Sequence, residues 1–160
     1  MNVVENQRDS PLLDQGLDLI RSSGTDACVL ISIPASSQAE TVARRIHAVS
    51  PSPRGRFVPV DCAASPPALE EELFGRIDGR YAAAACTLFL KEVGRLSLEH
   101  QHRLLATLID ATLASWPARM RARVIASTSE SLLDRVIHGT FDDRLFYRLN
   151  VIHLDLRPRN

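Results

Sequence analysis

Charged side chains that are able to do chemistry directly follow two apolar runs of the sequence. Lys91 and Glu92 come after the run 87–90, and Asp61 comes after the run 57–60. Ligands in α/β proteins bind at the carboxyl ends of strands, so Glu92 is a candidate general base. Two interpretations of Lys91 stay open: a salt bridge to Asp61 or Glu92, or a side chain that extends into solvent.

The segment Pro34–Ala39 follows the first apolar run, where many α/β proteins bind phosphate. A phosphate-binding loop needs glycines, whose backbone amides converge on the anion, and a lysine that neutralises it. This segment has neither, and Pro34 has no amide hydrogen. The chain has 18 arginines but a single lysine, Lys91, which does not follow a glycine. We therefore expect no phosphate binding of the usual kind here.

Two further groups are weaker candidates for a site. His100 and His102 lie two residues apart on a predicted helix and point to different sides, so we expect a solvated helix face rather than a metal site. Arg119, Arg121 and Arg123 are expected on a solvated surface, and contact with nucleic acid is the alternative. His47 is expected to be a packed or capping residue.

The three cysteines, Cys28, Cys62 and Cys86, lie among apolar residues and are expected to be buried free thiols in a reducing compartment. Cys62 has no basic neighbour in the sequence that would lower its pKa. The chain starts without a signal-like segment, and no apolar run approaches the roughly 20 residues that span a bilayer. These observations predict a cytoplasmic protein without membrane contact.

The elements that must position these residues are apolar runs alternating with helical patterns, as expected for a parallel sheet covered on both faces. With 160 residues, 19 of them basic and 19 acidic, the chain is expected to form one domain without a net field that attracts nucleic acid or membrane. Strands are expected at Cys28–Ile33, Phe57–Val60, Thr87–Leu90, Arg123–Thr128 and Asn150–Leu156, the second at an edge because of Pro59. Helices are expected at Ser10–Ser22 and Glu40–Val49, from Pro66 onward, and at Leu98–Leu113.

Several motifs recur in order along the chain: VLI (29–31), AR and IH (43–47), FVPVDC (57–62), ELFG (72–75), TLFLKEV (87–93), QHRLL (101–105), RVIAST (123–128) and FDDRLFYRLNV (141–151). In this order they resemble the sigma-54 interaction domain, the AAA+ ATPase module of bacterial enhancer-binding transcription activators. The resemblance implies a three-layer, P-loop NTPase-like (AAA+) α/β core with a five-stranded parallel sheet. It covers residues 10–160, after an N-terminal tail at 1–9, and the helical lid subdomain is expected to be absent.

The resemblance also places the phosphate loop of the family on Ile33, Pro34, Ala35, Ser36, Ser37, Gln38, Ala39 and Glu40. The three glycines and the lysine of the family fall on Ile33, Ser36, Gln38 and Ala39, so every group that holds a triphosphate is replaced. The metal-binding aspartate falls on Lys91, whose positive charge would repel magnesium. We therefore expect this phosphate loop to be vestigial, with no ATP and no metal bound.

Other functional residues of the family are partly retained. Glu92 matches the water-activating glutamate, and Asp61 takes the place of the asparagine that restrains it. Of two arginine fingers the first falls on Asp142, and the second is retained as Arg148, which in the family acts across a subunit boundary. We expect no catalytic residue here: Glu92, Asp61 and Arg148 are expected to be vestigial, because a base without nucleotide or magnesium has nothing to act on. The sigma-54-contacting loop GAFTGA reads GRYAAA at 79–84, so we expect the projecting hairpin to be deleted.

Three functions stay open on the sequence. The leading hypothesis is a bacterial pseudo-ATPase, similar to response regulators of two-component systems. It would act in transcription regulation through contacts with a homologous AAA+ activator or the sigma-54 machinery, without binding DNA itself. The alternative is a divergent ATPase of a sigma-54-dependent activator, with a rebuilt ATP and magnesium site that uses Lys91. A third hypothesis is a nucleic-acid binder that uses its arginines.

Overall fold

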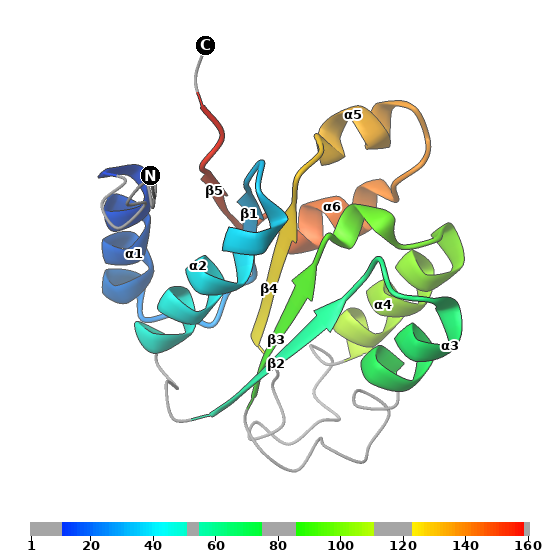
Figure 1. The fold of residues 1–160 in the computed structure, drawn as a ribbon, viewed down its shortest axis with the longest axis horizontal. Coiled ribbons are helices and arrows are strands. Elements are labelled where there is room, and N and C mark those ends of the chain that lie inside the picture. Colours follow the sequence, from blue (N-terminus) through cyan, green and yellow to red (C-terminus); the bar gives the residue numbers. More distant parts are fainter. Residues whose placement is uncertain (1–10, 51–54, 75–85, 111–122, 159–160) are drawn as a thin grey trace, which may run out of the picture.

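A computed structural model describes residues 11–50, 55–74, 86–110 and 123–158 of the chain. Five parallel strands form one sheet in the order β2-β3-β4-β1-β5 (Figure 1). The strands are β1 (Val29–Ser32), β2 (Arg56–Asp61), β3 (Cys86–Lys91), β4 (Arg123–Thr128) and β5 (Ile152–Asp155). The predicted parallel sheet is confirmed, and the strand that contains Pro59 lies at an edge, as predicted.

Helices cover both faces of the sheet, which gives three layers (Figure 1). On one face lie α1 (Pro11–Ser23) and α2 (Ser36–Ala48). On the other lie α3 (Pro66–Leu69), α4 (Leu98–Asp110), α5 (Leu132–Ile137) and α6 (Asp143–Leu149). A π-helical turn, Glu70–Phe74, continues α3, and a short 3₁₀ turn, Val93–Arg95, follows β3.

Neighbouring residues of each central strand face opposite cores. In β1, Leu30 packs into the core beneath α4 and α6, whereas Val29 and Ile31 pack beneath α1 and α2. Phe89 of β3 and Ile125 of β4 also belong to the second core. Because both faces are buried, these strands are continuous apolar runs, and this pattern made them recognisable in the sequence.

The first helix packs on its predicted face. Leu13, Leu17 and Ile20 are buried at helical spacing. Gly16 lies on the same face, and a Cβ atom at this position would overlap with a terminal methyl group of Leu154 on β5. The glycine therefore lets α1 approach the edge of the sheet closely.

Some predicted boundaries are wrong by a few residues. Helix α2 begins at Ser36 rather than at Glu40, because Ala39 is already enclosed in the core and extends the apolar face by a turn. The last strand is Ile152–Asp155, which is shorter than predicted. Residues 111–113 of the fourth predicted helix and the predicted tail at 1–9 lie outside the described residues. In the described segments no helix is long and apolar enough to cross a bilayer.

Candidate functional site

The carboxyl ends of the strands meet at one edge of the sheet, where ligands bind in α/β folds. Here Asp61 lies beside Lys91 in β2 and β3, and Ser32 lies beside Thr128 in β1 and β4. Glu92 directly follows β3. The structure thus brings Asp61, Lys91, Glu92 and the junction after Ser32 to one edge of the sheet, which we call the carboxyl edge.

The junction between β1 and α2 is short and apolar. Ile33 is buried and donates its N–H to the Thr128 carbonyl (3.0 Å). Pro34 has no N–H to donate. Ala35 caps α2 in an extended conformation, without a side-chain hydrogen bond. No residue of this described junction has a positive φ, so the backbone does not form the left-handed turns that glycines supply to a phosphate cradle.

Ala39 stands where the resemblance expects the phosphate-binding lysine. Its side chain is fully buried in the core beneath α1 and α2. Nearby, the Gln38 N–H donates to the Ala35 carbonyl (3.0 Å), and Glu40 forms an exposed ion pair with Arg44 (2.7 Å). The first turn of α2 therefore contributes no cation to the carboxyl edge.

Lys91 is half-buried and stands where the family places a metal-binding carboxylate. Within the described part of the chain, no ion pair joins Lys91 to Asp61 or Glu92. The exposed Asp61 carboxylate instead accepts a hydrogen bond from the Ala63 N–H (2.9 Å) and closes a local turn. The salt bridge, which was one of the two interpretations of Lys91, is therefore not formed.

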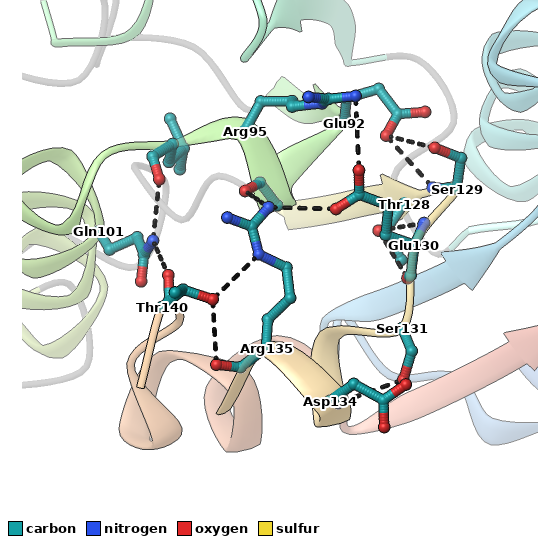
Figure 2. A network of polar contacts seen from close by, with 12 residues as sticks. Glu92, Arg95, Gln101, Thr128, Ser129, Glu130, Ser131, Asp134, Arg135 and Thr140 are labelled. Carbon is teal, nitrogen blue, oxygen red and sulfur yellow. Dashed lines mark hydrogen bonds and ion pairs between the residues drawn. The ribbon is translucent and has the colours of Figure 1, made fainter. Parts of the chain in front are cut away.

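Glu92 is buried and adopts a left-handed backbone conformation, with φ 54° and ψ 52°. One oxygen of its carboxylate, Oε2, accepts hydrogen bonds from the Ser129 N–H (3.2 Å) and the Ser129 hydroxyl (3.0 Å), as Figure 2 shows. The Glu92 N–H faces the Ser127 hydroxyl at 3.4 Å. The side chain that holds Glu92 is therefore Ser129, whereas Asp61 has no hydrogen bond to it.

The sequence analysis did not single out Ser129. It lies directly after β4, in a polar run that begins at Ser127. A polar run at the carboxyl end of a central strand is a usable signal, because parallel strands bring such runs to a common edge.

Cys62 lies beside the carboxyl edge and is buried. Burial raises the pKa of its thiol, and the negative charges of Asp61 and Glu92 raise it further. The prediction of a buried thiol is confirmed, and the group is a poor nucleophile because only the thiolate attacks. Cys28 and Cys86 are free but only half-buried, so the prediction of burial is wrong for these two.

Asp142, at the first arginine-finger position, caps α6. Its carboxylate accepts hydrogen bonds from the N–H groups of Arg144 (2.9 Å) and Leu145 (3.1 Å) and contacts His102 (3.2 Å). The side-chain hydrogen bond from Arg144 is the main reason that the pKa of Asp142 is lowered. An aspartate at this position caps the helix, which an arginine cannot do because its side chain accepts no hydrogen bond from a backbone N–H.

Arg148, the retained arginine, is half-buried on α6. Its Nη2 donates to the Leu108 carbonyl in the last turn of α4 (3.0 Å). A cation at the carboxyl end of a helix interacts favourably with the helix dipole and with carbonyls that lack helical partners. In this chain Arg148 therefore has a contact within its own fold.

Two of the other sequence expectations are wrong. His100 is buried rather than solvated: it stacks on Phe74 and hydrogen-bonds to Glu70 (2.8 Å). Arg123 is also buried, because it begins the central strand β4. His47 is packed as predicted, bonded to Thr87 (2.8 Å). Arg119, Arg121 and the loop 79–84 lie outside the described residues.

This five-stranded parallel sheet, with its carboxyl-edge site, defines a P-loop NTPase-like α/β core. The family model of the sigma-54 interaction domain matches residues 8–155. The chain therefore belongs to the sigma-54 interaction domain family.

Known proteins of this family are similar to the chain over most of its length. The regulatory protein AtoC of Escherichia coli is 36% identical over 92% of this chain and 36% of its own length. The DNA-binding transcriptional regulator NtrC of the same species is 36% identical over 86% of this chain and 33% of its own length. The chain thus spans about a third of each relative.

Solved structures agree with the fold. NtrX from Brucella abortus, in complex with ATP, superposes with a TM-score of 0.76 at 30% identity, over 95% of this chain and 38% of that one. The P-loop NTPase domain of a sigma-54 activator from Escherichia coli gives a TM-score of 0.62 at 19% identity, over 92% of this chain and 97% of that one. The second likeness shows the fold alone.

Proposed function

We propose that the chain is a non-hydrolysing regulatory module of the sigma-54 family. The observation that carries this proposal is Ala39, a methyl group enclosed in the core where a phosphate-binding lysine would stand. The apolar junction before it, with Pro34 and without positive φ values, supports the same conclusion. A triphosphate placed here would lose both its cation and its cradle of amides.

The rest of the carboxyl edge supports a pseudo-ATPase. Lys91 places a positive charge where a magnesium ion would bind, and like charges repel. Glu92 retains the form of a general base, but without nucleotide or metal it has no water to activate against a phosphate. We therefore assign Glu92, Asp61 and Arg148 no catalytic role, and the proposed function needs neither ATP nor magnesium.

The module would act in transcription regulation through protein contacts. Its relatives are named as regulators and transcriptional activators, which suggests a homologous AAA+ activator or the sigma-54 machinery as partner. We place it in the cytoplasm, in a system similar to two-component response regulators. Direct DNA binding is not part of the proposal, since Arg123 is buried and the net charge is zero.

Calorimetric titration with magnesium and ATP tests the first part of the proposal. The corresponding segment of NtrX from Brucella abortus, which was solved in complex with ATP, serves as the control when prepared in the same way. We expect no saturable binding by this chain and no hydrolysis above background under conditions that saturate the control. ATP hydrolysis by this chain that is abolished in the Glu92→Ala variant would refute the proposal of a non-hydrolysing module.

A rebuilt ATPase is the second candidate, and the position of Lys91 favours it. This side chain is half-buried at the carboxyl edge and forms no ion pair with either neighbouring carboxylate among the described residues, so its ammonium group is available for a phosphate. The same titration decides: ATP binding that is lost in Lys91→Ala supports the rebuilt site, with Arg44→Ala as the matched control at an exposed cation.

A capture experiment tests the partner. The immobilised chain is presented with a purified full-length sigma-54 activator and, separately, with sigma-54. We expect retention of at least one of them, and retention that withstands moderate salt, because surface electrostatic attraction alone is screened by salt. If neither protein is retained, the role through protein contacts is wrong even where the nucleotide result holds.

A further inference from the structure

Arg135, on α5, connects the turn after Glu92 with the segments around α5 (Figure 2). Its Nη1 donates to the Gly94 carbonyl and to the Glu130 carboxylate, the latter at 3.2 Å. Its Nε donates to the Thr140 hydroxyl at 3.3 Å. One guanidinium thus joins three parts of the chain, because its donors lie on separate nitrogens of a planar fork, whereas the three donors of an ammonium group lie on one atom.

A second set of contacts joins the same parts from the other side. Ser129 holds the Glu92 carboxylate through its N–H and its hydroxyl. The next residue, Glu130, is fixed by two hydrogen bonds with Thr128 Oγ1, at 2.9 and 3.2 Å. Glu130 also pairs with Arg95 at 3.4 Å.

These contacts close on themselves, and we call them the Glu92 ring. The ring runs from Glu92 to Ser129, along the chain to Glu130, then to Arg135, Gly94 and back through Val93 to Glu92. Besides Arg135, only the exposed ion pair between Arg95 and Glu130 joins Glu130 to this turn among the contacts of the ring, and exposed ion pairs contribute little. The Glu92 carboxylate is thus connected, through Ser129 and Glu130, to Arg135, which does not touch it.

Gly94 lies at a crowded point of the ring. A Cβ atom on Gly94 would lie 3.1 Å from Leu132 Cδ2 and 3.4 Å from Arg135 Nη1. The first distance is tighter than normal packing, so the Leu132 side chain, which lies next to Arg135, would have to shift by a few tenths of an ångström to admit a methyl group.

The backbone of Glu92 needs such support. Among the described residues it is the only one other than glycine with a positive φ (54°). This conformation is unfavourable for a residue with a Cβ atom and persists only where the surroundings hold it in place. The Glu92 carbonyl accepts the Arg95 N–H at 2.9 Å, which is a direct reporter of the turn.

We infer that Arg135 is a positioning residue for Glu92: by closing the Glu92 ring it holds the turn after β3 and the Glu92–Ser129 contact in one arrangement. This inference goes beyond the proposed function. It concerns the fold of the carboxyl edge in the free chain, and its test involves no nucleotide or partner. A failure of this inference can therefore be distinguished from a failure of the proposed function.

Amide hydrogen exchange of the Arg135→Met variant tests the inference. Methionine keeps an unbranched apolar stem but removes every donor of the guanidinium. We expect the Ser129 and Arg95 amides to exchange about tenfold faster or more, as for the loss of a hydrogen bond to a charged group. The Arg144→Met variant, at an exposed arginine that contacts Asp142, should leave both rates unchanged.

The Ser129 amide separates positioning from a local role. Arg135 does not contact this amide, which donates to Glu92. If only the Thr140 and Phe141 amides, which donate to the Arg135 carbonyl, exchange faster, Arg135 merely supports the end of α5 and the inference is overturned.

Gly94→Ala provides a second test if Arg135→Met does not fold. The added methyl group pushes on Leu132 and Arg135 while every donor and acceptor of the ring is kept. We expect faster exchange at Ser129 and Arg95 here too, with the amides of α2 unchanged. Unchanged exchange at Ser129 in this variant would overturn the inference as well. The Arg135→Lys variant should protect the Ser129 and Arg95 amides from exchange only in part, because lysine lacks the planar set of donors of a guanidinium.

Discussion

At the scale of single residues, burial gives neighbouring polar side chains different environments. Glu92 and Lys91 are neighbours, yet the glutamate is buried and held by Ser129, whereas the lysine is half-buried without an ion pair to either nearby carboxylate in the described chain. Cys62 is beside them and carries a raised thiol pKa because it is buried. These contrasts follow from the positions of the residues relative to the sheet rather than from their types.

Arg123 is the least compensated charged group among the described residues. It is 4% exposed, and its Nε and Nη2 have no hydrogen-bond partner, while Nη1 bonds to Ser50. Burial is the main reason that its pKa is lowered. Unpartnered buried donors cost about 1–3 kcal/mol, so we expect Arg123→Met to raise the free energy of unfolding by about 1 kcal/mol. Urea titration measures it.

Arg21→Met is the control for this prediction. Arg21 is exposed, and its contact with Asp18 is a surface ion pair of little value, so we expect a change within about 0.5 kcal/mol. A lower stability of Arg123→Met than of Arg21→Met would show that the guanidinium is compensated in the fold.

At the scale of elements, local signals predicted the first four helices but not α5 and α6, and they misplaced some of the predicted ends. The Ser10-Pro11 start and the Leu13, Leu17 and Ile20 spacing predicted α1 correctly. The start of α2 was missed because Ser36 and Ser37 favour turns and caps, whereas burial of Ala39 against the sheet extends the helix. Tertiary packing here overrides local preference.

The N-cap of α6 gives a prediction at this scale. Replacing Asp142 by alanine removes the acceptor of two backbone N–H bonds, so we expect a loss of about 1 kcal/mol in the free energy of unfolding. Asp142→Ser should retain most of it, because the hydroxyl also caps. Thermal unfolding followed by circular dichroism measures both variants at one pH.

The pH dependence of this loss has a definite sign. The folded-state pKa of Asp142 is below its ordinary value, so its charge stabilises the fold above the unfolded pKa of about 3.9. This contribution is lost as the pH falls through the folded-state value. The difference in the free energy of unfolding between the native chain and Asp142→Ala should therefore become smaller in acid. A difference that does not change with pH would contradict the assigned charge of Asp142.

At the scale of the whole molecule, one sheet separates two apolar cores. Ile20 belongs to the core beneath α1 and α2, and Leu104 to the core beneath α4 and α6. Since both cores share the central strands, we expect the chain to unfold as one cooperative unit. Ile20→Ala and Leu104→Ala should each lower the free energy of unfolding by about 2–5 kcal/mol, with unchanged urea dependence.

Denaturant titration followed by circular dichroism checks this prediction. Amide hydrogen exchange should give the same urea midpoint of unfolding for the helices on the two faces of the sheet. A biphasic transition in one variant, with one face unfolding first, would show that the cores are independent.

The sequence by itself determined the sheet, its order of elements and the family, because strands buried on both faces are apolar runs and the motifs recur in register. Through the resemblance it also aligned Ala39 with the phosphate-binding lysine of the family and Lys91 with its metal-binding aspartate. Only the tertiary structure decided that Ser129 holds Glu92, that Arg135 closes the ring behind it, and that Arg123 is buried. These contacts join residues far apart in the chain, and the packing of strands and helices, rather than any local pattern, brings them together.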